Sequence, residues 1–140
     1  MCTKKKTIKE QDCVARHINA VQEGMGFVSE DIKSVAQMHD WTKIKYNKEY
    51  IEALNSKNIK ESEWFQKYHL LERHHLNDKA PEDVNYIDIL ERIIDMCASA
   101  DFKKDEFNWK RAAISPEILI DAYFNTIEMV LDHYDRETIE

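Results

Sequence analysis

The scarcity of glycine and proline is the feature that most constrains the fold of this chain. Its 140 residues include only two of each, whereas turn-rich all-β folds need many residues that accept the backbone angles of tight turns. The length suits one domain that is large enough to bury a hydrophobic core without disulfide or metal cross-links. We therefore expect an all-α fold: a single-domain, compact helical bundle of about five to seven helices over residues 1–140, with residues 1–6 flexible.

Apolar spacing predicts where the helices lie. Val14, Ile18 and Val21 share one face of a first helix over residues 8–23, because side chains three, four and seven positions apart align in a helix. The segment Gly24-Met25-Gly26 ends that helix, and Ser29 is a suitable N-cap for a second one. Further helices are predicted over residues 59–76, 81–101 (with Pro81 in the first turn) and 116–134 (with Ser115 as N-cap), with shorter pieces near 48–55.

Charge and targeting signals narrow the class of protein. The formal net charge of −7 argues against non-specific binding to nucleic acid backbones. No apolar run reaches the length of a membrane span, and the basic N-terminus lacks the apolar stretch of a signal peptide. The odd set Cys2, Cys13 and Cys97 has no CxxC spacing and predicts reduced thiols. We expect a cytoplasmic protein with no membrane association, in the host cytoplasm if the gene is viral.

Three polar residues occupy positions where the helical pattern calls for an apolar one. His17 lies on the first stripe, His39 ends the second, and Asp101 extends the stripe of the helix over residues 81–101. Burying a charge is costly unless it is paired or binds a metal. Together with Asp40 these residues predict a site for Mn, Fe, Co, Ni or Zn, which accept imidazole and carboxylate ligands. The alternatives are hydrogen-bonded core histidines and a surface Asp101 that caps a turn or pairs with the lysines after it.

Which carboxylate of the helix over residues 81–101 could bind a metal depends on the helix face that each one occupies. At 100° per residue, Asp88, Glu91 and Asp95 share the face opposite the apolar stripe, which is typical of a solvated edge. Asp101 lies near the middle of the stripe. We therefore predict Asp101, and not Asp95, as a metal ligand.

The segment from His69 to His75 adds further candidates. On a helix over residues 59–76, His75 lies near the centre of the apolar face, His69 on its flank, and His74 points away. His75 or His69 could complete a second metal site or donate a proton to a leaving group; the alternative is a favourable contact with the helix dipole. Glu72 is either a surface residue or a support for the site. Lys43, one turn after Asp40, could neutralise a substrate phosphate, or be a surface lysine.

The order of these residues resembles the signature of the HD-domain superfamily of metal-dependent phosphohydrolases. The segment His39-Asp40-Trp41-Thr42-Lys43 is similar to the family's HD-x-x-K pattern, and Ala100-Asp101 to its closing A-D element. The double histidine within residues 73–78 is similar to that of dimetal members. The likeness covers about residues 14–104, and small HD-like proteins of phage genomes are similar as well.

The resemblance implies an HD-like fold and a set of site residues. The primary metal ligands would be His17, His39, Asp40 and Asp101. His69 and one of His74 and His75 would bind a second metal or contact the phosphate, so one or two ions are expected. Asp40, Lys43, His69 and His75 would serve catalysis. Trp41-Thr42 replaces the small apolar-Gly pair of the family, and no Gly-Tyr-Pro motif follows the double histidine, which argues against a cyclic dinucleotide phosphodiesterase of that subtype.

The expected activity is hydrolysis of a phosphoester, in a nucleotide or a related small phosphorylated metabolite, by a metal-activated water. The alternative is a non-catalytic HD-like protein that binds a metal or nucleotide, for example a phage factor that sequesters a ligand or binds a host protein. A third reading is an iron oxygenase built on the same scaffold. The sequence does not predict the oligomeric state.

Overall fold

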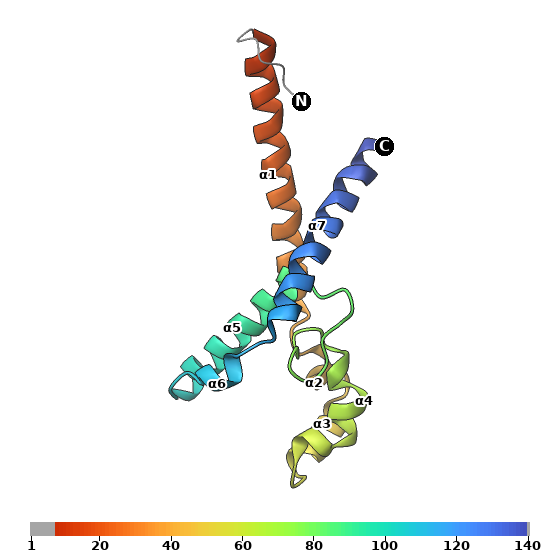
Figure 1. The fold of residues 1–140 in the computed structure, drawn as a ribbon. Coiled ribbons are helices and arrows are strands. Elements are labelled where there is room, and N and C mark those ends of the chain that lie inside the picture. Colours follow the sequence, from red (N-terminus) through yellow and green to blue (C-terminus); the bar gives the residue numbers. More distant parts are fainter. Residues whose placement is uncertain (1–7, 140) are drawn as a thin grey trace.

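The computed structural model describes residues 8–139, and every regular element among them is helical, which confirms the prediction of an all-α bundle. Residues 1–6, expected to be flexible, lie outside the described residues. Figure 1 shows α1 and α7 meeting near the middle of the molecule, with α5 and α6 on one side below and α2, α3 and α4 on the other. The elements are α1 (Ile8–Gln37), α2 (Trp41–Lys45), α3 (Asn47–Leu54), η1 (Ile59–Glu61), α4 (Glu63–Lys67), η2 (His69–Leu71), α5 (Tyr86–Lys103), α6 (Trp109–Ala112) and α7 (Pro116–Ile139).

The two glycines do not end the first helix, as the sequence predicted, because α1 runs through them without a break. Gly24 instead lies where α7 comes closest. The Tyr134 hydroxyl donates to the carbonyl of Ala20, and the rings of Phe27 and His133 stack with centroids 4.1 Å apart. Gly24 therefore serves the close approach of two helices.

The crossing of α1 and α7 makes a pair of glycine variants informative. A Cβ at Gly24 would clash with the Tyr134 hydroxyl, whereas a Cβ at Gly26 meets nothing within 4 Å. We expect Gly24→Ala to lower the free energy of unfolding by about 1–2 kcal/mol through overpacking. Gly26→Ala should raise it by roughly 0.5–1 kcal/mol, since alanine loses less backbone entropy in a helix. Urea unfolding measures both, and equal effects would contradict the packing of α7 against Gly24.

Two helix starts show how local capping decides the boundaries. α7 begins at Pro116, as predicted. α5 begins at Tyr86, later than the predicted start at Pro81, because Asn85 and Asp88 form a capping box: each side chain accepts a hydrogen bond from the backbone of the other. Residues 72–85 consequently form an irregular loop (the 72–85 loop).

The predicted helix over residues 59–76 is wrong. Asn58 and Ser62 each accept a hydrogen bond from a backbone N–H two or three residues on, so the chain is divided into the short elements η1, α4 and η2. Trp64 and Phe65 of α4 pack with Ala53 of α3 in one small core cluster. His74 and His75 consequently lie on the 72–85 loop, and their directions follow that loop rather than a helical period.

Two observations bear on where the protein resides. Cys97 has a free thiol on the exposed side of α5, whereas Cys13 is disulfide-bonded, so the expectation of three reduced thiols is wrong. Among the described helices, none combines the length and the apolar character that a membrane span requires. The compartment stays a prediction.

Candidate metal centre

The centre forms where the end of α1, the 72–85 loop and α5 meet. His39 and Asp40 lie between α1 and α2, and Asp40 adopts the left-handed backbone conformation (φ 54°, ψ 29°) that turns the chain into α2. Positive φ is uncommon outside glycine, although Asp tolerates it, and such residues cluster at functional sites. Glu91 and Asp95, one turn apart on α5, project toward His39.

Each of two imidazoles, those of His39 and His74, lies within 4 Å of both the Asp40 and the Asp95 carboxylate. His39 Nε2 is 3.2 Å from an Asp95 oxygen and 3.5 Å from an Asp40 oxygen. His74 Nε2 is 3.6 Å from the other Asp40 oxygen and 3.8 Å from the other Asp95 oxygen. Tetrahedral donors at about 2.1 Å from a metal are roughly 3.4 Å apart. The donors of His39, Asp40 and Asp95 lie within 4.8 Å of one another and can hold one ion. His74 faces the other oxygen of each carboxylate, so its ring would have to shift to reach the same ion.

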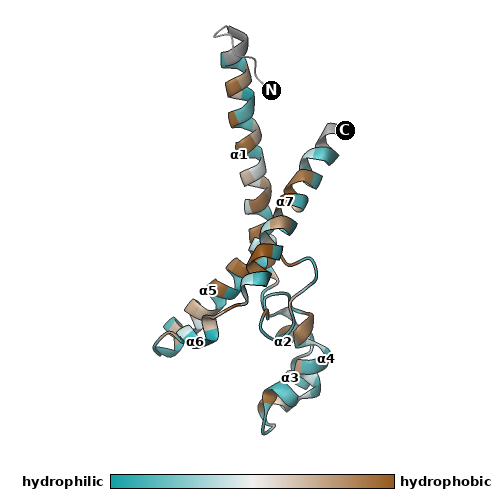
Figure 2. Ribbon diagram, in the orientation of Figure 1, coloured by the Kyte–Doolittle hydropathy of each residue, from teal (hydrophilic) through white to brown (hydrophobic). Residues whose placement is uncertain are grey.

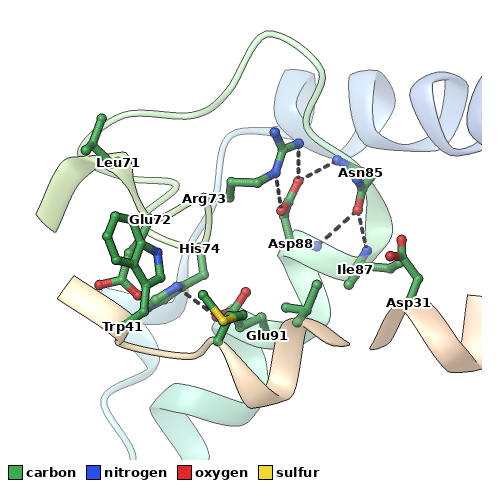
Figure 3. A pocket seen from close by; sticks show the side chains of 12 residues that line it. Asp31, Trp41, Leu71, Glu72, Arg73, His74, Asn85, Ile87, Asp88 and Glu91 are labelled. Carbon is green, nitrogen blue, oxygen red and sulfur yellow. Dashed lines mark hydrogen bonds and ion pairs between the residues drawn. The ribbon is translucent and has the colours of Figure 1, made fainter. Parts of the chain in front are cut away.

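The Glu91 carboxylate lies close to Nδ1 of both the His39 and the His74 imidazole. His39 Nδ1 donates to Glu91 Oε1 at 2.9 Å, and His74 Nδ1 lies 3.1 Å from the same oxygen; Figure 3 shows the His74 contact. Burial raises the pKa of Glu91, but the two histidines lower it more, so the net shift is downward. The hydrogen bond to Glu91 places the proton of His39 on Nδ1 and leaves its Nε2 free to bind a metal.

Two histidines of the 72–85 loop have buried ring nitrogens without hydrogen-bond partners among the described residues. His74 is only 2% exposed, yet neither of its ring nitrogens makes a well-oriented hydrogen bond within the described part of the chain, and the same is true of His75 Nε2. Leaving a buried polar atom unpaired costs about 1–3 kcal/mol. Binding of a cation by His74 Nε2 would remove one of these costs.

A second buried cluster lies on the other side of Asp40. His69 Nδ1 is 2.8 Å from the Thr42 hydroxyl oxygen and 2.9 Å from a Glu72 oxygen, and the Thr42 hydroxyl donates to Glu72. The His75 ring packs against His69 with centroids 4.1 Å apart. Burial, with His69 and His74 nearby, lowers the pKa of His75 to about 3, so this ring is neutral. Donors of Asp40, His69 and Glu72 lie within 4.8 Å of one another, which leaves one or two ions as the expectation.

Lys43 brings a positive charge to the edge of the centre. Its Nζ lies 2.6 Å from Asp40 Oδ2, one helical turn away, as the spacing predicted. Burial lowers the pKa of Lys43, but Asp40 raises it more. Burial likewise raises the pKa of Asp40, and Lys43 with His39 outweighs that effect. Both groups are therefore charged, and they form a half-buried ion pair at the edge of the centre.

Of the predicted site residues, the structure brings six together: His39, Asp40, Lys43, His69, His74 and His75. His17 lies apart from them, exposed on α1. Because α1 is continuous to Gln37, the rise of about 1.5 Å per residue places His17 roughly 30 Å from the end of the helix, next to His39. The prediction of His17 as a ligand in the same site fails with the predicted break at the glycines.

The structure also reverses the choice between Asp101 and Asp95. The Asp101 side chain is 84% exposed and lies 3.5 Å from Lys104, which is the surface pairing left open above. Asp95 joins His39 and His74. The facing argument assumed that the apolar stripe of α5 is the buried one, yet Leu90 and Ile94 are exposed. The polar 72–85 loop covers the opposite face, so the carboxylates point inward.

Three residues of the centre were missed: Thr42, Glu91 and Asp95. The available signal was the spacing of Asp88, Glu91 and Asp95, which places three carboxylates on one face of α5. That pattern predicts an acidic face in any environment. Only the position of the 72–85 loop distinguishes an inward acidic face from a solvated one.

A cavity of about 350 Å³ adjoins the centre, between α1, the 72–85 loop and α5. Figure 3 shows Arg73, His74, Asp88 and Glu91 among the residues that line it, together with Trp41. The volume is in the range of small-molecule sites, which combine apolar walls with a few placed polar groups. A ligand in this cavity would contact the Glu91 and His74 side of the centre.

No family model, curated protein or solved structure matches the chain. The resemblance to the HD-domain superfamily therefore stays a prediction from the residues. The function has to be argued from the geometry of the centre.

The position of Glu91 leads to a quantitative expectation. We expect Glu91→Ala to weaken divalent metal binding about 10–100-fold, because residues that orient metal-bound histidines contribute this much. Competition with a metal-sensitive dye measures the affinity. Glu52→Ala, an exposed glutamate of α3, is the control and should leave it unchanged. Unchanged affinity in Glu91→Ala would contradict its role.

Proposed function

We propose that this protein is a metal-dependent phosphohydrolase that hydrolyses a phosphoester in a nucleotide or a related small phosphorylated metabolite. The observation that carries the proposal is the set of one imidazole and two carboxylates, His39, Asp40 and Asp95, whose donors lie within 4.8 Å of one another, with the His74 imidazole facing both carboxylates. Such mixed donors favour Mn, Fe, Co, Ni or Zn. A bound ion would polarise a phosphoryl oxygen and lower the pKa of a water molecule.

The electrostatics support an anionic substrate only with a cation present. Asp40, Glu91 and Asp95 place several negative charges within one small region, and these repel a phosphate unless a metal reverses the local field. Lys43 supplies the adjacent positive charge. In this proposal its ammonium contacts a phosphate oxygen and orients the substrate.

The two remaining histidines take different parts in the proposal. His75 keeps a buried Nε2 without a hydrogen-bond partner among the described residues, and this atom can exchange a hydrogen bond with water or the leaving oxygen. His69 is held by Thr42 and Glu72, so it positions the ring of His75. The cavity of about 350 Å³ accommodates the rest of the substrate.

The test is phosphate release from a panel of nucleotides by protein supplied with Mn²⁺, Co²⁺ or Ni²⁺. We expect metal-dependent turnover. Lys43→Ala should lower kcat/KM about 10–100-fold while metal content is retained, since a charge-assisted hydrogen bond contributes roughly 1.5–3 kcal/mol. Lys45→Ala, exposed on the same helix, should retain full activity.

Two results would overturn the enzymatic proposal. Stoichiometric metal binding with no turnover on any phosphoester would favour the non-catalytic metal- or nucleotide-binding alternative. Turnover that is unchanged by Lys43→Ala would remove the assigned role of that lysine.

A further inference from the structure

The accessible surface of the chain is far larger than a folded monomer of its mass exposes. The area is 11135 Å² for 16.7 kDa, whereas the scaling for monomeric proteins gives about 7,600 Å². The excess is about 3,500 Å² per chain on that scaling. Large apolar side chains contribute to it on α1, α5 and α7.

The exposed apolar residues of α1 form a regular stripe. Val14, Ile18, Val21 and Met25 are between 49% and 69% exposed, and their spacing of four, three and four residues is that of a coiled-coil seam. The same spacing continues toward the metal centre through Val28, Ile32 and Val35, which are partly covered. The seam is therefore covered beside the centre and uncovered toward the N-terminal end of α1.

α7 carries a second stripe with the same spacing. Ile120, Phe124, Ile127 and Leu131 are between 39% and 60% exposed. Figure 2 shows apolar segments recurring along both α1 and α7, the two helices that extend beyond the rest of the molecule. Exposed apolar patches of this extent on a folded protein mark an interaction surface.

We infer that a second copy of this chain covers the α1 and α7 stripes, so that the protein is a symmetric dimer with a helical interface. The excess area is sufficient, because obligate homodimers bury about 2,000–5,000 Å² in total, counting both subunits. The buried hydrophobic residues of the described chain form two small clusters. A partner must therefore be present whenever the chain is folded, and a second copy meets that condition.

Charge also permits self-association along α1. The positions that flank this stripe in a coiled coil are Ala15, His17, Gln22 and Gly24, and none carries a negative charge. Two chains of net charge −7 can therefore approach along α1 without like charges at the seam. On α7, Asp121 and Glu128 lie on one edge of the stripe, and Tyr123 and Val130 widen the other edge.

Light scattering coupled to gel filtration tests the inference. We expect the full-length protein to have twice the chain mass of 16.7 kDa at micromolar concentration. Ile18→Glu and Phe124→Glu should each shift the mass toward that of one chain. Ile44→Glu, at an 81% exposed position on α2, is the control and should leave the dimer intact. A single-chain mass for the unmutated protein, or a trimer or tetramer, would overturn the inference.

A second measurement does not depend on the variants folding. The melting temperature of the unmutated protein should rise with protein concentration, because unfolding of a dimer releases two chains. A melting temperature that is independent of concentration would overturn the dimer. Neither outcome bears on metal binding or hydrolysis, so this inference and the proposed function are tested separately.

Discussion

Asp95→Asn is expected to strip the divalent cation from the purified protein. The Asp95 carboxylate faces His39 Nε2 with one oxygen and His74 Nε2 with the other, at 3.2 and 3.8 Å, and its donors group with those of His39 and Asp40 around the proposed ion. Removing its charge takes away one ligand and part of the attraction that holds the cation. Elemental analysis should show a fall from about one ion per chain to under about a tenth, because even residues that only orient ligands contribute 10–100-fold in affinity.

Asp101→Asn is the matched control on the same helix. Its exposed side chain lies beside Lys104, so the metal content should stay at the unmutated level, as should that of His17→Ala. His74→Ala should behave like Asp95→Asn. The opposite pattern, with metal lost in Asp101→Asn and kept in Asp95→Asn, would contradict this centre. It would instead support Asp101 as the ligand, as the helical spacing predicted.

His39 lies in the centre and His17 does not, which shows what helical periodicity can and cannot predict. The Val14 and Ile32 stripes, predicted on two separate helices, lie on one face of the continuous helix α1, and His39 lies just beyond its covered end. His17 shares the spacing but lies at the uncovered end. Helical spacing identifies which residues are aligned, whereas burial along the stripe depends on what packs against it, and here only the half beside the centre is covered.

The error over Asp95 has a related cause. Sequence patterns predict a buried apolar face because apolar burial stabilises most proteins. On α5 the 72–85 loop instead places Arg73 and His74 against the acidic face. That loop has no helical or strand period, so its position could not be predicted from spacing. It is set by tertiary contacts, among them the pair formed by Arg73 and Asp88 and the burial of Leu76 and Val84 in a core cluster.

Arg73→Ala is therefore expected to destabilise the protein strongly. Asp88 is buried and accepts two hydrogen bonds from Arg73, at 2.9 and 3.0 Å; these bonds raise the pKa of Arg73. Without Arg73 the carboxylate keeps one backbone donor, the N–H of Asn85. Removing one partner of a buried ion pair costs about 3–5 kcal/mol, and we expect roughly 2–4 kcal/mol because Arg73 is partly exposed. Urea unfolding at fixed protein concentration, with a chelator present, measures this loss.

Asp83→Asn tests the exposed Arg73–Asp83 ion pair separately from the buried Arg73–Asp88 pair. Asp83 contacts the same guanidinium at 2.8 Å but its side chain is 79% exposed, and exposed ion pairs contribute about 0–1 kcal/mol. A similar loss in both variants would show that Arg73 acts through surface charge. If the buried pair instead fixes the 72–85 loop, folded Arg73→Ala protein should also bind metal more weakly, because His74 follows Arg73 directly and loses its support opposite Glu91, while Asp83→Asn should bind metal normally.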